Sequence, residues 1–390
     1  MKVLHLRTGC RLHFGLIELA AGEPMRFAGL GLMLDQPNFE LAFSAAESFT
    51  IDASHIEPPS PAAADASANS TADSKAEFES RIGAAIRQRQ TLVAGTAQSS
   101  TACHVRLLNA LPLHSGLGAG TQLAASVAAG LELFTRARPI GPAQPAARSL
   151  QPARWQPILD AQPTLSAQWL SQHAARGLRS AVGLVGFLRG GLILDEGYPT
   201  DKACGANADP MTRPLAAQTL QLAAAWRVVL AVPQQRAEIS GAKEAEVMAE
   251  LGSLPNPHRQ QMLALAQRAM GLAADNNQFA EFTDCLDRYM QYGAQLFSRY
   301  QGGMYNGADV TEAVQLAQAV GLRGVGQSSW GPTVFGFAES QACAEHRAKQ
   351  LRRQRPNWSV RISTPATSGA RYRWQPSLHK ETQSCDSSVQ

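Results

Sequence analysis

The sequence predicts an α+β protein with two domains. A chain of 390 residues is long for a single hydrophobic core, and its 45% of apolar residues is enough to bury a sizeable one. Strand patterns and helix patterns alternate along most of the chain, as in mixed sandwich folds. A strongly apolar strand pattern at 226–232 follows a polar linker. We therefore expect an N-terminal α/β domain over 1–200 and a C-terminal domain over 217–375.

Composition narrows the range of partners. Lys and Arg number 35 against 31 Asp and Glu, and no long basic run is present, so nucleic acid is not expected as a partner. The small positive excess would suit a substrate rich in phosphate. The N-terminus lacks the apolar core of a signal peptide, and no window reaches the apolar length of a membrane span. We expect a cytoplasmic protein without a membrane partner.

The six cysteines are scattered along the chain. None forms a Cys-x-x-Cys pair, and none has histidines nearby at metal-ligand spacing. Buried free thiols in a reducing compartment are therefore expected rather than disulfides or zinc ligands.

The N-terminal segment is predicted to form a sheet. Val3–Thr8 and Leu12–Leu19 have strand patterns and are expected to be joined around Gly9. Further strands are expected at 29–35 and 39–43. Three polar side chains in this N-terminal segment are candidates for a site, although each could instead be paired at a sheet edge: Arg11, His13 and Glu18.

Two stretches interrupt the regular patterns. Residues 53–76 are rich in Ala, Ser, Pro, Asp and Asn, so we expect a disordered or loosely held insertion there, followed by a helix at 77–90. Residues 136–163 carry six prolines, which block regular elements of useful length and leave a lid or a disordered insert as alternatives. The polar tail at 376–390 is expected to be disordered.

A glycine-rich loop precedes an amphipathic helix in LPLHSGLGAGTQLAASVAAGLELFT, residues 111–135. Gly116, Gly118 and Gly120 keep Cβ atoms away from the backbone, and the first helical turn offers unpaired N–H groups and the positive end of the helix dipole. A strand predicted at 103–110 gives the loop a context that suits phosphate. The spacing matches neither a Walker loop nor the dinucleotide fingerprint. A turn that packs a helix closely on a sheet is the alternative.

Two arginines flank a glycine in RGLRSAVGLVGFLRGGLILDEG, which follows a short helix predicted at 168–178. Arg176 and Arg179 would form a clamp for an anion. Solvated arginines at a helix end would give the same pattern, so both interpretations stand. The segment then enters a strand predicted at 192–194.

The second half of the chain predicts a sheet covered by helices. After the strand at 226–232, Ser240 is a candidate N-cap for a helix. A second glycine-rich loop occurs in GVGQSSWGPTVFGF, residues 324–337. The other expected elements are helices at 260–273, 279–300, 309–319 and 342–353 and strands at 334–337 and 358–363.

Three motifs in this order, RLHFGLIEL, PLHSGLGAGTQLAA and GVGQSSWGPTVFGF, resemble the galactokinase–homoserine kinase–mevalonate kinase–phosphomevalonate kinase (GHMP kinase) superfamily. Together with RGLRSAVGLVGFLRGGLILDEG, they are most similar to the β-ribofuranosylaminobenzene 5′-phosphate synthase family. The resemblance spans nearly the whole chain apart from the two inserts. It implies a GHMP-kinase-like α+β fold, with an N-terminal ribosomal-protein-S5-like α/β domain, a C-terminal ferredoxin-like domain and a ligand cleft between them.

The chain departs from the kinase pattern at two places. Kinases of the superfamily usually carry Gly-Leu-Gly-Ser-Ser-Ala-Ala in the phosphate loop, where this chain has GLGAGTQ from Gly116. They also carry an aspartate seven residues before a Gly-Gly pair, and this chain has Gly183 at that position. A glycine cannot act as a base. Both departures favour phosphoribosyl diphosphate over a nucleotide as the ligand of the loop.

The resemblance implies an enzyme, a transferase that condenses phosphoribosyl diphosphate with 4-aminobenzoate or another para-substituted benzoate. Diphosphate and CO₂ would be released, as a step of methanopterin-type cofactor biosynthesis. The leaving diphosphate needs backbone N–H groups, cations and a divalent metal, expected to be Mg²⁺, and a carboxylate could steady the ribosyl cation. No organic cofactor is expected. An ATP-dependent GHMP small-molecule kinase and a non-catalytic ligand-binding member of the fold are the alternatives.

The expected partners are small-molecule substrates, and a homodimer would be usual for the family. The expected catalytic residues are Asp35, Glu18, Arg179 and Lys243. Phosphate would be held by Ser115, Gly116, Leu117, Gly118, Ala119, Gly120, Thr121 and Arg176. Substrate would contact Arg11, His13, Ser180, Glu246, Gln327, Ser328, Ser329 and Trp330, with Trp330 stacking on the arene. The metal ligands are unassigned, with Asp35, Glu18 and Glu246 as candidates.

Overall fold

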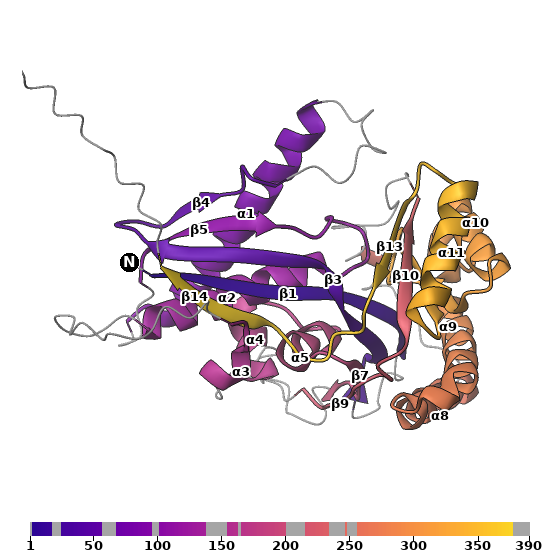
Figure 1. Cartoon of the computed structure of the whole chain (residues 1–390). Helices are drawn as coiled ribbons and strands as arrows, with labels where there is room; N and C mark the ends of the chain where they lie inside the picture. Colours follow the sequence, from indigo (N-terminus) through magenta and orange to yellow (C-terminus); the bar gives the residue numbers. More distant parts are fainter. Residues whose placement is uncertain are drawn as a thin grey trace, which may run out of the picture.

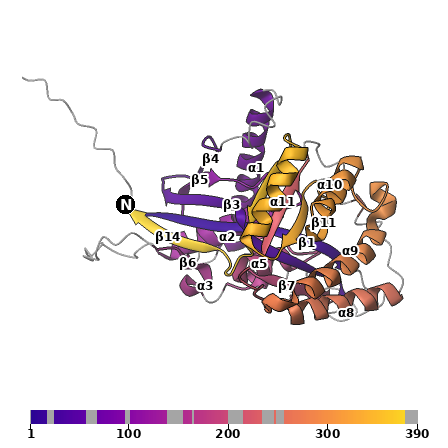
Figure 2. The same cartoon turned by 45° about the vertical axis from the view of Figure 1, so that its right-hand side comes forward.

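The computed structural model describes residues 2–17, 25–56, 68–95, 101–137, 154–162, 165–199, 215–233, 246–247 and 256–376 (Figure 1). These residues form two sheets with helices packed on them, so the predicted α+β class is confirmed. The larger sheet lies at the N-terminal side of the molecule, and the helices from the second half of the sequence gather beyond the smaller sheet (Figures 1 and 2).

Two long antiparallel strands, β1 (Lys2–Ile17) and β3 (Ala28–Ala45), form the centre of the larger sheet. The strand order in the described residues is β4-β5-β3-β1-β14-β6. Strand β7 pairs with another part of β3, and β9 pairs with β7. A separate two-stranded pair joins β2 to β8. The bounds are β2 (Met25–Arg26), β4 (Thr50–Asp52), β5 (Cys103–Asn109), β6 (Gln156–Pro157), β7 (Leu192–Asp195), β8 (Tyr198–Pro199), β9 (Ala217–Leu220) and β14 (Arg371–Pro376).

The prediction of two strands joined around Gly9 is wrong, because β1 runs through that position without a turn. The pairing register of β1 with β3 shifts between Thr8 and Cys10, so Gly9 lies at an irregularity of the ladder. A Cβ atom on Gly9 would lie 1.8 Å from the Leu34 carbonyl oxygen, which explains why the position needs glycine. The strands expected at 29–35 and 39–43 are likewise parts of one strand, β3.

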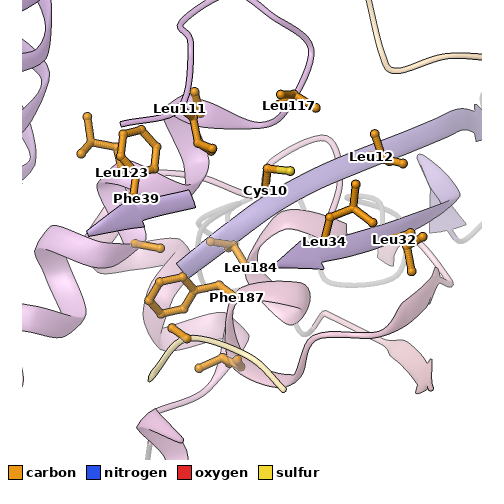
Figure 3. Packing of buried hydrophobic residues seen from close by; sticks show 14 of the residues in the cluster. Cys10, Leu12, Leu32, Leu34, Phe39, Leu111, Leu117, Leu123, Leu184 and Phe187 are labelled. Carbon is orange, nitrogen blue, oxygen red and sulfur yellow. The ribbon is translucent and has the colours of Figure 1, made fainter. Parts of the chain in front are cut away.

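Five helices accompany this sheet in the described residues, and α2 is the central one. It packs on β1, β3, α1, α4 and α5. The Thr8 hydroxyl donates to the side-chain oxygen of Gln122 in α2 at 2.8 Å, and Gln122 donates to the Gly183 carbonyl oxygen in α5 at 2.8 Å. Buried side chains from β1, β3, α2 and α5 meet at this junction (Figure 3). The bounds are α1 (Ala68–Val93), α2 (Ala119–Arg136), α3 (Ile158–Ala161), α4 (Ala167–Ala174) and α5 (Val182–Arg189).

Both predicted inserts are shorter than expected. Helix α1 begins at Ala68, inside the stretch 53–76 that was predicted to be irregular. Within 136–163, β6 pairs with β14 and Ile158 of α3 is fully buried, so the end of that stretch belongs to the fold. The remainders of both stretches, 57–67 and 138–153, lie outside the described residues, as does the tail beyond Pro376.

The smaller sheet is antiparallel with the order β11-β12-β10-β13. Following the chain, β10 is succeeded by helices, then β11, β12, α11 and β13, which is the βαββαβ order of a ferredoxin-like fold. The helices predicted at 260–273, 279–300, 309–319 and 342–353 and the strands predicted at 226–232, 334–337 and 358–363 are confirmed to within a few residues, whereas the helix predicted after Ser240 lies almost wholly outside the described residues. The bounds are β10 (Arg227–Val232), α8 (Asn256–Leu272), η3 (Asn276–Gln278), α9 (Phe279–Gln301), α10 (Ala308–Ala319), β11 (Arg323–Gln327), β12 (Val334–Ala338), α11 (Gln341–Gln354) and β13 (Ser359–Ser363).

The two halves of the chain are interlocked. Strand β14, near the end of the described chain, pairs with β1 of the larger sheet, and β9 pairs with β7. Helix α9 packs on β1, and the buried Tyr289 hydroxyl donates to the Gly15 carbonyl oxygen at 2.8 Å. The helix therefore fixes β1 beside the smaller sheet, at the place where the candidate site lies.

Cys10, Cys103 and Cys285 are buried free thiols, as predicted, whereas Cys343 is free but only half-buried, and Cys204 and Cys385 lie outside the described residues. Burial raises the pKa of the Cys103 thiol to about 12, so this thiol stays protonated at neutral pH. In the part of the chain that the structure describes, no helix has the length and apolarity needed to cross a membrane.

Candidate active site

A cavity of about 520 Å³ opens between the larger sheet and helix α9. Its walls come from β1, the loop before α2, the turn between α4 and α5, α9, and the loop between β11 and β12. Three of these segments are the glycine-rich or arginine-containing motifs selected from the sequence. The structure thus brings together segments that lie more than 300 residues apart along the chain.

The loop before α2 has the backbone of an anion cradle. Gly116 and Gly118 have backbone φ angles of 80° and 74°, which residues other than glycine rarely adopt. Gly118 is the N-cap of α2, so the N–H groups of Ala119 and Gly120 begin the helix without intrahelical acceptors. Among the predicted phosphate-binding residues only Leu117 does not line the cavity, because its side chain is buried in the core.

The two glycine-rich loops are tied to each other through Ser328. This residue is fully buried, and its hydroxyl donates to the Gly116 carbonyl oxygen at 2.8 Å and accepts from the His13 N–H at 3.1 Å. A Cβ atom on Gly116 would lie 2.2 Å from the Ser328 carbonyl oxygen. The expectation that Ser328 contacts substrate is therefore corrected: it holds the loops in place behind the cavity wall.

The neighbours of Ser328 do line the cavity. The Ser329 N–H donates to the His13 carbonyl oxygen at 3.1 Å. The Gln327 side chain accepts from the Asn306 N–H at 2.8 Å and donates to the Ser329 carbonyl oxygen at 2.8 Å. Both groups of the Gln327 amide are thus used to shape the loop, which limits what it can offer a ligand.

Four arginines line the cavity, and we call Arg11, Arg81, Arg176 and Arg179 the arginine cluster. No aspartate or glutamate lines the cavity among the described residues. A Cβ atom on Gly120 would lie 3.4 Å from Arg81 Nη1 and 3.8 Å from Arg176 Nη2, so both guanidinium groups stand at the N-terminus of α2. Partial burial, reinforced by the nearby Arg81 charge, lowers the pKa of Arg176. Such a concentration of positive charge favours a multiply charged anion.

Arg81 is oriented by a carboxylate behind it. Its guanidinium donates to Glu77 at 2.6 Å, one helical turn earlier in α1. The His114 Nε2 atom lies 3.1 Å from the same Glu77 oxygen. Hydrogen bonds from Arg81 and His114 lower the pKa of Glu77 and outweigh the desolvation that opposes them. Glu77 therefore stays ionised and holds two cavity-lining residues in place.

Five large apolar side chains also line the cavity, and we call Phe14, Met290, Phe297, Met304 and Trp330 the apolar wall. The Phe297 and Trp330 rings meet edge to face with centroids 4.8 Å apart, and only 7% of Trp330 is exposed. The Trp330 carbonyl oxygen accepts from the Asn306 side chain at 2.8 Å. This fixed aromatic pair is suited to contact a flat apolar ligand.

A buried carboxylate supports the backbone next to two polar residues that line the cavity, His13 and Ser180. His13 Nε2 lies 3.3 Å from the Ser180 hydroxyl oxygen, which also accepts from the Val182 N–H at 3.2 Å. Asp195 is 1% exposed and accepts from the N–H groups of Ala181 at 2.6 Å and Gly197 at 3.0 Å. Burial raises the Asp195 pKa to about 6 despite these donors, and burial lowers the His13 pKa well below its ordinary value.

The predicted carboxylates that the structure describes, Asp35 and Glu246, do not line the cavity. Asp35 lies on β3, 3.5 Å from Arg371, and burial raises its pKa although Arg371 opposes the shift. Glu246 is exposed and does not line the cavity, although the adjacent Val247 packs against Trp330. Glu18 and Lys243 lie outside the described residues.

The described side chains do not fit a divalent metal held by the protein. Mg²⁺ prefers carboxylate oxygens, and no cluster of three possible metal ligands occurs in the described ranges. The arginine cluster instead offers positive charge directly to a ligand. Expected metal ligation by Asp35 or Glu246 is therefore not supported by their positions.

Arg81, His114 and Asp195 belong to the site but were not selected from the sequence. Arg81 lies in a predicted helix without a motif, and only the tertiary packing of α1 brings it to the loop. His114 lies two residues before the first glycine of the loop, and this position was the signal that could have marked it as a candidate. Asp195 ends the apolar strand LILD, and a lone acid at the end of a buried strand is the signal that could have found it.

The described residues have the fold of the GHMP kinases, and both arginines and large apolar side chains line their cavity. A phosphomevalonate kinase from Streptococcus pneumoniae covers 93% of this chain and 100% of its own, with a TM-score of 0.56 and 10% identity. A mevalonate pyrophosphate decarboxylase from Streptococcus pyogenes has a TM-score of 0.55 at 11% identity, with 96% of this chain and 98% of that chain covered. These similarities establish the fold.

Curated proteins of one name are similar to most of the chain. A β-ribofuranosylphenol 5′-phosphate synthase from Methanothermobacter thermautotrophicus is 21% identical over 342 residues, covering 87% of this chain and 89% of the relative. The protein of the same name from Archaeoglobus fulgidus is 23% identical, with the same coverage. No family model matches the chain. The resemblance to this synthase family within the GHMP kinase superfamily is confirmed, as is the expectation of a transferase.

Proposed function

We propose that the protein joins phosphoribosyl diphosphate to a para-substituted benzoate, forming a C–C bond to the ribose and releasing diphosphate and CO₂. The observation that carries this proposal is a cavity lined both by the arginine cluster with the N-terminus of α2 and by the apolar wall. The similarity to synthases whose names specify a ribofuranosylphenol 5′-phosphate supports the same reaction class.

The phosphate groups of the substrate match the arginine cluster and the N-terminus of α2. Phosphoribosyl diphosphate carries a 5′-phosphate and a diphosphate, and the cavity offers four guanidinium groups and the first-turn N–H groups of α2. As the bond from ribose C1 to the diphosphate breaks, negative charge grows on the leaving group. Hydrogen-bond donors already fixed at the position of the leaving group stabilise the transition state, where this charge develops, more than the ground state.

The arene matches the apolar wall. The face of a benzoate ring can pack on Trp330, which Phe297 holds in place. An arginine of the cluster can meet the benzoate carboxylate until the ring reacts. The ring carbon that bears the carboxylate would then face ribose C1.

The proposed chemistry balances without an oxidant or a proton donor. The ring carbon that bears the carboxylate attacks ribose C1 with a π electron pair as the C1–O bond to diphosphate breaks. The C–C bond to the carboxylate then breaks, its electron pair restores the aromatic ring, and CO₂ leaves. A hydroxyl or amino group para to this carbon stabilises the cationic ring intermediate. Both 4-hydroxybenzoate and 4-aminobenzoate meet that requirement, and the phenol in the relatives' names favours the former.

The ATP-dependent kinase is the second candidate, because the structural neighbours include kinases. The position of the kinase aspartate is Gly183, where a Cβ atom would lie 2.9 Å from Thr121 Cγ2. The close packing of α5 on the first turn of α2 therefore leaves no room for a longer side chain there without a shift. With no carboxylate lining the described part of the cavity, the kinase is the weaker of the two proposals.

The test incubates pure protein with Mg²⁺, phosphoribosyl diphosphate and carboxyl-labelled 4-hydroxybenzoate or 4-aminobenzoate. Labelled CO₂ released in proportion to diphosphate supports the synthase. No labelled CO₂, together with ADP formation from ATP and a small alcohol, would replace it with the kinase. If neither assay shows product and phosphoribosyl diphosphate raises the Tm of the protein, a non-catalytic binding protein is favoured.

Several accompanying expectations belong to this proposal. Mg²⁺ would arrive with the diphosphate, since the described cavity presents phosphate-binding cations rather than metal ligands. The cytoplasmic location, the homodimer and the place in methanopterin-type cofactor synthesis are part of the same proposal. A gel-filtration mass measured with and without substrate tests the homodimer.

A further inference from the structure

The turn that joins α4 to α5 brings Arg176 and Arg179 to the cavity. Its start is fixed by Ser171, which is buried in the last turn of α4. The Ser171 hydroxyl donates to the Arg176 carbonyl oxygen at 2.7 Å, and the Arg176 N–H donates to the Ser171 carbonyl oxygen at 3.2 Å. Two hydrogen bonds thus tie the first arginine of the turn to α4.

The end of the turn is fixed by Asp195 at Ala181, two residues beyond Arg179. The Asp195 Oδ2 atom accepts from the Ala181 N–H at 2.6 Å, and the Oδ1 atom accepts from the Gly197 N–H at 3.0 Å. The Ala181 carbonyl oxygen accepts the first hydrogen bonds of α5. Both polar groups of the Ala181 backbone are therefore engaged, which restricts the direction in which the turn enters the helix.

Asp195 is itself fixed by the larger sheet. It is the last residue of β7 and stands opposite Gly29 of β3 and Ala217 of β9 in the pairing register. The end of α5 that it contacts lies against the first turn of α2, where Gln122 donates to the Gly183 carbonyl oxygen at 2.8 Å. Asp195 therefore connects a paired strand to the turn beside the phosphate loop.

The two hydrogen bonds of Asp195 require a carboxylate. Each carboxylate oxygen accepts from a different backbone N–H, whereas an amide has one oxygen and would place its NH₂ group against one of these donors. Burial raises the pKa of Asp195 to about 6, so the charge of this acid at neutral pH opposes folding. A role in orienting the backbone accounts for the buried carboxylate better than a role in stability.

We propose that Asp195 is a positioning residue for anion binding: through the Ala181 N–H it fixes the turn that carries Arg179, and it thereby directs the Arg179 guanidinium toward an anion at the first turn of α2. The anion is of the diphosphate class, because four guanidinium groups line the cavity. That this diphosphate belongs to phosphoribosyl diphosphate rests on the proposed function, whereas the coupling of Asp195 to Arg179 does not.

A double-mutant cycle tests this role with inorganic diphosphate as the probe. Isothermal titration measures the Kd for the native protein, Asp195→Asn, Arg179→Ala and the double variant at about pH 8, where the native Asp195 is ionised. We expect each single substitution to raise the Kd about tenfold and the double variant to bind like Arg179→Ala alone. Effects that multiply to about a hundredfold would show that Asp195 does not act through Arg179, and would overturn the proposal.

Matched controls separate this coupling from a general disturbance of the site. Arg11 lines the same cavity from β1, outside the turn, so the effects of Asp195→Asn and Arg11→Ala should multiply. An Asp195→Asn effect that also vanishes in Arg11→Ala would overturn the specific link to Arg179. Asp284→Asn makes the same substitution at an exposed ion pair with Arg323 and should leave the Kd unchanged. A folded Asp195→Asn protein with the native Kd would equally overturn the proposal.

A measurement on the native turn covers the case in which Asp195→Asn does not fold. The Ala181 amide signal is followed by ¹H–¹⁵N NMR in the native protein and in Arg179→Ala while inorganic diphosphate is added to saturation. Because binding at Arg179 and the hydrogen bond of Ala181 are coupled through the turn, the signal should shift in the native protein and stay in place in Arg179→Ala. Equal shifts in both proteins, or no shift in the native protein, would contradict the inference.

The reaction gives a separate readout. Asp195→Asn should raise the KM for phosphoribosyl diphosphate about tenfold and leave the KM for 4-hydroxybenzoate unchanged. Equal increases in both KM values would indicate a general structural role and overturn the positioning role. Failure of the CO₂ assay, with the diphosphate cycle as expected, would reject the proposed reaction and leave the role of Asp195 standing.

Discussion

Substituting Gly120 with alanine should weaken phosphate binding without lowering the stability of the folded protein. It lies in the first turn of α2, its φ angle is not in the left-handed region, and a Cβ atom there would make ordinary contacts with Arg81 at 3.4 Å and Arg176 at 3.8 Å. In Gly120→Ala the backbone therefore loses unfolded-state freedom without a clash. The folded state should gain about 0.5 kcal/mol, or a Tm rise within about 2 °C.

The same methyl group should impair the anion site. It would stand between the helix N-terminus and the two guanidinium groups, where the phosphate oxygens are expected. Losing one charge-assisted hydrogen bond costs about 1.5 to 3 kcal/mol, so the Kd for inorganic diphosphate should rise roughly tenfold or more. Isothermal titration measures this binding, and thermal unfolding measures the stability of the same samples.

The matched control is Gly271→Ala in α8, where a Cβ atom would meet no atom within 4 Å. This variant should gain up to about 1 kcal/mol of stability from helix propensity and bind diphosphate like the native protein. A Gly120→Ala protein that is folded and binds diphosphate with native affinity would refute the phosphate cradle. A large loss of stability in Gly120→Ala would refute the geometry assigned to the loop.

The remaining predictions concern the arginine cluster, the apolar wall and the half-buried His173. Arg176→Ala should raise the Kd for diphosphate about tenfold, with the exposed Arg288→Ala as the unaffected control. Trp330→Leu should raise the KM for the benzoate about three- to tenfold and leave the KM for phosphoribosyl diphosphate unchanged, and equal effects on both would contradict the apolar wall. His173 Nδ1 lies 3.2 Å from Arg89 Nη1, and burial lowers its pKa to about 4. Because the folded pKa lies below the unfolded value, the neutral ring contributes full stability above pH 6.5 and loses it as the pH falls to 4, by at most about 3 kcal/mol. Urea unfolding of His173→Gln should therefore show a smaller loss of stability between these pH values than the native protein.

The elements that local pattern controls were predictable from the sequence. The helices of the second half have apolar faces with helical spacing, and their predicted bounds agree with α8, α9, α10 and α11. The strand β5, the glycine-rich loop and helix α2 were also predictable, because they follow one another directly in the sequence and each has its own local pattern. The prediction of a turn at Gly9 was wrong because a glycine at a β-bulge and a glycine in a turn give the same sequence pattern. Only the partner strand distinguishes them.

The candidate site was predictable only in part. Its glycine-rich loops and Arg176 and Arg179 carried local signals, and the structure places them around one cavity. Arg81 carried none, since its role depends on how α1 packs beside α2. Asp35 was selected for its place at the end of a strand pattern, yet β3 continues beyond it and pairs it with Arg371. Which acids enter a cavity depends on pairing register and sheet order, which the spacing of residues does not reveal.

The bond formed by the reaction gives the most direct test of the proposed function. The protein is incubated with phosphoribosyl diphosphate labelled with ¹³C at ribose C1 and with 4-hydroxybenzoate labelled at the ring carbon that bears the carboxylate. The proposal predicts a product in which ¹³C NMR shows one-bond coupling between the two labelled carbons, with one CO₂ released for each product. A product without this coupling, joined through the phenol oxygen or the carboxylate, or recovery of both substrates unchanged, would contradict it.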